Sequence, residues 1–177
     1  NIIDINGKPL IQYTIDEVQK SKYIDHYSVS TEDQQIADVV KKFNVGVHNR
    51  PAYLAKNTTT SAESLMEVVS KIGLQYDYLV EIMATNPLKT VKDIDGVIEI
   101  KNDRLIDFYP EIPESRRQDL TPAAYVRNGS IYATTIKSFI ENKVRLGSDT
   151  RPYIMSEENT INIDEPRDLD LARVIIK

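Results

Sequence analysis

The apolar residues of this chain switch repeatedly between helical and strand spacing. Ile36, Val39, Val40 and Phe43 recur at the spacing of one helical face. Short runs rich in β-branched and aromatic residues lie between such helical segments, and they predict strands over residues 26–30, 45–48, 78–83, 125–134 and 160–163. Strands that alternate with helices indicate an α/β fold, with a mostly parallel sheet that helices cover on both faces.

Capping residues and prolines predict where several helices begin and end. Thr31 with Gln34 and Thr60 with Glu63 have the spacing of capping boxes, in which two side chains satisfy the first amides of a helix. Pro9 and Pro166 are typical of a first helical turn. In addition, Gly73 stands where a helix that starts near residue 60 needs a C-terminal cap.

Composition narrows the class of protein. The chain has 177 residues, which suits one domain, and a net charge of −5, which argues against a general nucleic-acid binder. It has no cysteine, so it has no disulfide, zinc–thiolate site or cysteine nucleophile, as is usual in the cytoplasm. No apolar run approaches the ~20 residues of a membrane helix, so we expect a cytoplasmic protein without a membrane partner.

Irregularities at two places in the sequence indicate missing segments. The sequence opens on Asn1 without an initiator methionine. A helix predicted from Val91 to about Glu99 is followed closely by the apolar run 105–108, where a buried strand and its connection should intervene. We therefore expect a single domain over residues 1–177 that lacks an N-terminal loop and a segment near residue 100.

The segment from Arg116 to Tyr132 concentrates groups that suit an anionic ligand. Arg116, Arg117 and Gln118 could grip a phosphate or carboxylate through parallel hydrogen bonds. Asn128-Gly129 could bring a backbone amide close to the ligand. Taken alone, however, the arginines are better explained as a solvated basic turn, and Asn128-Gly129 as a type I′ hairpin.

Other polar residues follow predicted strands, where ligands of α/β sheets bind. Asp164 could hold Mg²⁺, which favours carboxylate oxygens together with phosphates, or it could simply cap the following helix. Arg50 and Ser61 could line a nucleotide pocket, although ordinary helix capping explains Ser61 slightly better. Thr85-Asn86-Pro87 has the composition of a substrate loop.

In order along the chain, these pieces resemble the acylneuraminate cytidylyltransferases, also called CMP-sialic acid synthetases. The collinear motifs are Asn6-Gly7-Lys8-Pro9-Leu10, Val29-Ser30-Thr31, Arg50-Pro51-Ala52, Thr85-Asn86-Pro87-Leu88, Arg117-Gln118, Asn128-Gly129-Ser130-Ile131-Tyr132 and Asn162-Ile163-Asp164. The resemblance implies a Rossmann-like nucleotidyltransferase fold, usually as a homodimer. It also implies an enzyme that uses Mg²⁺ to couple CTP to a nine-carbon (nonulosonic) 2-keto sugar acid, releasing pyrophosphate.

The resemblance also assigns roles to individual residues. It implies nucleotide contacts for Asn1, Arg50 and Ser61, and a sugar contact for Thr85. Asp164 matches a metal-binding aspartate and, with Arg117, would be catalytic. The remaining sugar- and phosphate-side contacts would be Arg117, Gln118, Asn128 and Tyr132.

Departures from the family pattern leave the identity of the sugar and the number of metal ions open. Asn162 stands where some members have a second metal-binding aspartate, and Met83-Ala84 replaces a Gln-Pro pair beside the sugar. Tyr53 replaces a frequent Glu. The resemblance also places a Gly/Ser/Lys/Arg-rich loop, with a catalytic Arg and Lys, just before Asn1.

Two alternatives remain at this stage. One is a nucleotidyltransferase for another keto sugar acid, such as an eight-carbon one, or a glycosyltransferase of similar architecture. The other is a non-catalytic nucleotide-binding protein that has lost the basic loop.

Overall fold

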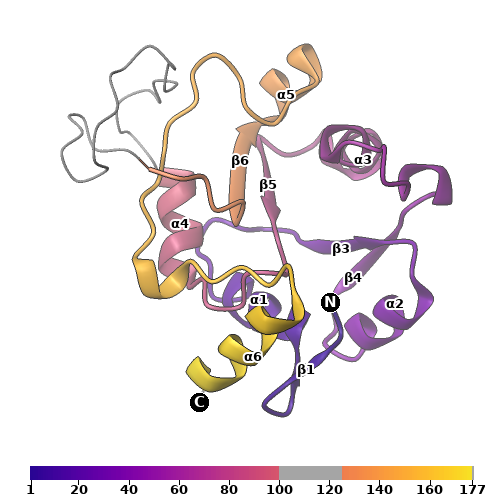
Figure 1. The fold of residues 1–177 in the computed structure, drawn as a ribbon. Helices are drawn as coiled ribbons and strands as arrows, with labels where there is room; N and C mark the ends of the chain where they lie inside the picture. Colours follow the sequence, from indigo (N-terminus) through magenta and orange to yellow (C-terminus); the bar gives the residue numbers. More distant parts are fainter. Residues whose placement is uncertain (100–124, 177) are drawn as a thin grey trace.

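The computed structural model describes residues 1–99 and 125–176, so Arg116, Arg117 and Gln118 lie outside the described residues. Helices and strands alternate through most of the chain, as predicted (Figure 1). The strands are β1 (Asp4–Ile5), β2 (Lys8–Pro9), β3 (Ser28–Thr31), β4 (Gly46–Asn49), β5 (Tyr78–Ile82) and β6 (Ile131–Thr135). The α-helices are α1 (Leu10–Val18), α2 (Gln34–Lys41), α3 (Ser61–Val68), α4 (Val91–Glu99), α5 (Ile136–Asn142) and α6 (Pro166–Ile175). Shorter turns are η1 (Ala52–Leu54), the π turn η2 (Val69–Gly73) and η4 (Glu157–Asn159).

The strands of the described residues pair two by two. β3 and β4 are parallel, with Ser28 opposite Gly46 and Thr31 opposite Asn49. β5 and β6 are antiparallel, and β1 and β2 form a small hairpin. No ladder joins β3 to β5 within the described residues, so each of these strands has one unpaired edge there.

Three apolar clusters hold these elements together. In the first, Ile5 and Leu10 pack against Leu169 and Ala172 of α6, which places β1 and the start of α1 beside the last helix (Figure 1). The second joins α1 to α2 and the β3–β4 pair through residues Ile11, Ile15, Val40 and Val45. The third packs α5 and the end of α3 against β5 through residues Val69, Ile136 and Phe139. No helix of the described residues is both long and apolar enough to cross a membrane.

Several predicted helix ends are confirmed. Thr60 and Glu63 form a reciprocal capping box at the start of α3, and Pro166 is the first residue of α6. Pro9 directly precedes α1. The predicted cap at Gly73 is one residue early, because Gly73 is the last residue of the π turn η2 and Leu74 is its C-cap. The predicted helix over 91–99 is α4.

Two predicted caps are wrong by one or two residues. Asp33, and not Thr31, caps α2, because its carboxylate accepts from the amides of Gln35 and Ile36 while Thr31 ends β3. Glu165, and not Asp164, is the N-cap of α6. At α2 the Asp33 carboxylate satisfies the first amides, whereas at α6 Asp168 Oδ2 accepts from the amides of Asp164 and Glu165.

The predicted strands over 125–134 and 160–163 are largely wrong. Only residues 131–135 pair with β5, so Asn128-Gly129 is not a hairpin turn. The Asn128 side chain instead accepts from the Ser130 amide at 3.1 Å and bends the chain locally. In the second run, the Ile163 amide bonds to the Thr85 carbonyl at 2.8 Å, but no ladder forms there.

Candidate active site

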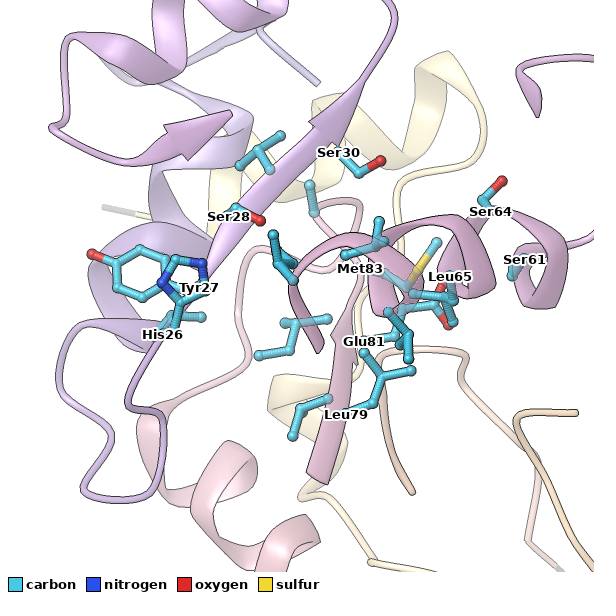
Figure 2. Close-up of a pocket in the computed structure, with 18 of the residues that line it drawn as sticks. His26, Tyr27, Ser28, Ser30, Ser61, Ser64, Leu65, Leu79, Glu81 and Met83 are labelled. Carbon is cyan, nitrogen blue, oxygen red and sulfur yellow. The ribbon is translucent and has the colours of Figure 1, made fainter. Parts of the chain in front are cut away.

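A cavity of about 1180 Å³ opens between β3, α3 and β5, and it brings four of the predicted site residues together. These four lining residues are Asn1, Arg50, Ser61 and Thr85. Figure 2 shows Ser28 and Ser30 of β3 on one side of the cavity and Leu79 and Glu81 of β5 on another. The lining includes many apolar side chains, such as Ile11, Leu65 and Leu79, whereas the four predicted residues are polar or charged.

One side of the cavity is built from Thr31, Arg50 and Ser61, and we call it the β3–α3 wall. The Arg50 amide bonds to the Thr31 carbonyl at 3.0 Å, which continues the β3–β4 ladder by one residue. The guanidinium of Arg50 binds Glu32 through two nitrogens, with a distance of 3.0 Å from Nε to Oε2. This pairing lowers the pKa of the Glu32 carboxyl. Arg50 therefore brings a positive charge to the cavity that a neighbouring carboxylate already holds in place.

Ser61 owes its position to the capping of α3. Thr60 Oγ1 accepts from the Glu63 amide at 3.2 Å, and Glu63 Oε2 accepts from the Thr60 amide at 2.7 Å. The bond from the Thr60 amide lowers the pKa of Glu63. Ser61 is thus the first helical residue of an eight-residue helix, a place where amides and the helix dipole favour an anion.

Another part of the lining comes from Met83, Ala84 and Thr85, at the start of residues 83–90, which we call the 83–90 loop. The Met83 amide bonds to the Ser130 carbonyl at 2.9 Å, and this contact ties the loop to the start of β6. The Thr85 carbonyl accepts from the Ile163 amide at 2.8 Å. Because Asp164 follows Ile163, this bond places the backbone of the predicted metal-binding aspartate near Thr85, although Asp164 itself does not line the cavity.

Asp164 is exposed, and its Oδ2 accepts from Asn162 Nδ2 at 2.7 Å. Residues 1–99 and 125–176 contain no cluster of three or more acidic, histidine or cysteine side chains that could hold a metal. Mg²⁺ in nucleotide enzymes commonly takes only one or two carboxylates and completes its shell with phosphates and water. The single carboxylate of Asp164 fits that donor set.

Asn128 and Tyr132 do not line the cavity. The Asn128 amide nitrogen lies 3.0 Å from Met155 Sδ. Tyr132 lies opposite Glu81 in the β5–β6 ladder, and the Arg145 guanidinium stacks 4.3 Å from the centre of its ring. Because Arg145 also donates to Glu81 at 2.6 Å, Tyr132 belongs to a polar cluster that meets the cavity only through Glu81. Arg117 and Gln118 lie outside the described residues, so their roles stay predictions.

Sequence reasoning missed Lys89, a buried lysine within the 83–90 loop. Its Nζ donates to Thr14 Oγ1 at 2.8 Å and also to two loop carbonyls. The Thr90–Asp93 spacing is that of a capping box, and Asp93 does accept from the Thr90 amide at 2.8 Å. That signal could have placed Lys89 just ahead of α4, but no sequence pattern indicated its burial.

Comparison with known proteins identifies the family of this chain. A family model described as Cytidylyltransferase matches residues 1–135. Pseudaminic acid cytidylyltransferase of Campylobacter jejuni is 24% identical over 210 residues, covering 100% of this chain and 89% of the relative. CMP-N,N'-diacetyllegionaminic acid synthase of Legionella pneumophila is 27% identical over 200 residues, covering 97% of this chain and 86% of the relative.

A solved structure supports the fold. The 4-diphosphocytidyl-2C-methyl-D-erythritol synthase of Anaerococcus prevotii superposes with a TM-score of 0.62 at 15% identity, covering 97% of this chain and 87% of that one. The predicted α/β nucleotidyltransferase fold is therefore confirmed. Because the family match spans well over half of the sequence, the chain belongs to the cytidylyltransferase family of enzymes.

Proposed function

We propose that this enzyme transfers CMP from CTP to a nonulosonic, sialic-acid-like 2-keto sugar acid and releases pyrophosphate. The observation that carries the proposal is the meeting of Asn1, Arg50, Ser61 and Thr85 at one cavity. The full-length similarity to enzymes named for pseudaminic and legionaminic acids supports the choice of sugar class.

The reaction is an in-line displacement at phosphorus. The anomeric hydroxyl of the sugar acid attacks the α-phosphorus of CTP, a new oxygen–phosphorus bond forms, and the bond to the β-phosphate oxygen breaks. Pyrophosphate leaves and the hydroxyl proton passes to water. Such chemistry depends on positioning and charge neutralisation more than on covalent help from the protein.

Different residues would bind the two substrates. In the proposal, Arg50, Ser61 and Asn1 bind and orient CTP, while Thr85 orients the sugar acid. Asp164 would hold Mg²⁺, which when bound neutralises phosphate charge.

The remaining assigned residues act on the sugar and phosphate side. Arg117 would pair with an anionic group of the substrate, and Gln118, Asn128 and Tyr132 would complete the sugar side. We also propose a homodimer, which light scattering of the purified protein can test.

We further propose that a segment bearing the basic loop precedes Asn1. Three observations support it: β3 and β5 each have an unpaired edge within the described residues, both strands line the same cavity, and Asn1 lines it too. In addition, the buried Ser30 Oγ of β3 has no hydrogen-bond partner in the described part of the chain. An intact mass of the native protein well above 20.2 kDa is expected, and a mass equal to that value would contradict this proposal.

Pyrophosphate release from a panel of nucleotides and sugar acids tests the function. We expect the fastest release with CTP and a nine-carbon 2-keto acid, at least tenfold above that with an eight-carbon acid, using the full polypeptide and Mg²⁺. Turnover with an eight-carbon keto acid alone would replace the proposed substrate. Nucleotide binding without any turnover would favour the non-catalytic alternative.

A further inference from the structure

Lys89 is among the largest fully buried side chains of the described residues, with 1% of its surface exposed. A lysine is rarely buried to this extent, because its ammonium group loses strong hydration unless the protein supplies partners. The mechanism proposed above gives this residue no role.

The Lys89 ammonium sits among three oxygen acceptors. Its Nζ donates to Thr14 Oγ1 of α1 at 2.8 Å, to the Met83 carbonyl at 2.7 Å and to the Asn86 carbonyl. An ammonium group has three N–H donors and no acceptor, so these partners match its protonated form. The Lys89 amide also donates to Asn86 Oδ1 at 3.2 Å.

The two lysine-bound carbonyls flank Thr85 in the chain. Met83 lies two residues before Thr85 and Asn86 lies one residue after it, so the ammonium fixes the backbone on both sides of the threonine. The Thr85 carbonyl in turn accepts from the Ile163 amide, next to Asp164. Lys89 thus holds the backbone on both sides of Thr85 without lining the cavity itself.

Carboxylates on two helices face the same region. Glu17 of α1 accepts from the Val91 amide at 2.7 Å, and Asp93 of α4 accepts from the Thr90 amide at 2.8 Å. Burial lowers the pKa of Lys89 to about 7, while the charges of Asp93 and Glu17 oppose this shift. The end of the 83–90 loop is therefore anchored to α1 and α4 by groups that all surround Lys89.

We propose that Lys89 is a positioning residue of the active site, whose ammonium group holds the 83–90 loop in the form that presents Thr85 to the sugar acid. The inference rests on the proposed role of Thr85 as a sugar contact. A lysine with a purely structural role would lower stability without separating the two substrates. A positioning lysine would raise the KM for the sugar acid more than the KM for CTP, because Arg50 and Ser61 lie on other elements.

The test compares Lys89→Met with Lys92→Met in the full polypeptide. Methionine matches the lysine side chain as far as Cε but has no ammonium group to donate, whereas Lys92 is an exposed lysine three residues further on. We expect Lys89→Met to raise the KM for the sugar acid about tenfold, and the KM for CTP less than twofold. Lys92→Met should leave both values unchanged.

A milder variant keeps the test valid if Lys89→Met does not fold. Thr14→Val removes only the acceptor on α1 and leaves both carbonyl bonds of Lys89, so we expect a smaller rise, of about threefold, again confined to the sugar acid. Equal sugar-acid KM values for wild type and for each folded variant would overturn the proposal, as would an equal rise for both substrates.

Amide hydrogen exchange separates this proposal from the proposed function. Exchange in residues 83–90 should be faster in Lys89→Met than in Lys92→Met, and this readout needs no substrate. Faster exchange in a protein that turns over no nonulosonic acid would refute the proposed function and keep Lys89 as the support of the loop. Unchanged exchange would refute the role of Lys89 itself.

Discussion

The two sides of the cavity are held in place by different physical means. On the β3–α3 wall, Thr60 and Glu63 cap α3 within three residues of sequence, and Arg50 pairs with Glu32 near the surface. The 83–90 loop instead depends on buried contacts that are distant in sequence, such as Lys89 with Thr14 of α1. Local, solvated contacts tolerate substitution, whereas a buried polar group that loses its partner costs much more. We therefore expect function to be most sensitive on the loop side.

The largest effect is expected at Asp164, which the loop reaches through the bond from Ile163 to Thr85. Asp164→Ala should lower Mg²⁺-dependent pyrophosphate release from CTP and sugar acid by at least ~100-fold, since removing a charged group that stabilises the reacting phosphates typically costs that much. Asp170→Ala on the exposed face of α6 is the control and should retain activity. Near-normal turnover of Asp164→Ala would remove the metal assignment.

The second effect is on stability. Lys89→Met should lower the free energy of unfolding by about 2–3 kcal/mol, because buried loop carbonyls lose their donor. Chemical denaturation against Lys92→Met measures the difference, and a loss as small as that of the control would show that the loop does not depend on this lysine.

The same pair of variants should show a pH dependence. Burial lowers the pKa of Lys89 to about 7 in the folded protein, whereas in the unfolded chain it has the ordinary lysine pKa of 10.5. Between these two pKa values the unfolded chain therefore binds more protons than the folded protein. The contribution of Lys89 to stability therefore rises with pH across this window. The deficit of Lys89→Met should be larger at pH 9 than at pH 6.5, and an opposite trend in denaturation curves would contradict the account.

A smaller effect is expected on the β3–α3 wall. Thr60→Ala removes the capping hydroxyl of α3 and should cost about 1 kcal/mol of unfolding free energy. A loss by Thr60→Ala larger than that by Lys89→Met would reverse the comparison between the two sides.

The smallest change concerns Glu32. Its side chain is 38% exposed, so the pair with Arg50 should contribute less than about 0.5 kcal/mol to stability. Glu32→Ala frees the guanidinium, and we expect a KM for CTP that falls by about twofold in steady-state kinetics. A KM that rises would mean that Glu32 orients Arg50 for the nucleotide.

The contrast between local contacts and contacts distant in sequence also explains which features the sequence could predict. The capping box of α3 was predicted because all its partners lie within four residues. The cap of α2 was not, since Asp33 competes with Thr31 and spacing alone does not rank them. Likewise, nothing local distinguishes Asn128-Gly129 in a hairpin from the bend that the structure contains.

For the site, order along the chain was more informative than any single motif. It brought Asn1, Arg50, Ser61 and Thr85 into one prediction, and these residues line one cavity. The same prediction also named Asn128, Tyr132 and Asp164, which do not line it. It could not reveal Lys89, because the burial of that side chain depends on Thr14, 75 positions away in the sequence.

The most direct test of the central claim is the product itself. The full polypeptide should convert CTP, Mg²⁺ and a nine-carbon 2-keto sugar acid to a CMP-sugar and one equivalent of pyrophosphate, as followed by mass spectrometry and phosphorus NMR. We expect a kcat/KM at least tenfold higher for this sugar class than for an eight-carbon keto acid. A higher value for the eight-carbon acid, or no CMP-sugar at all, would contradict the account.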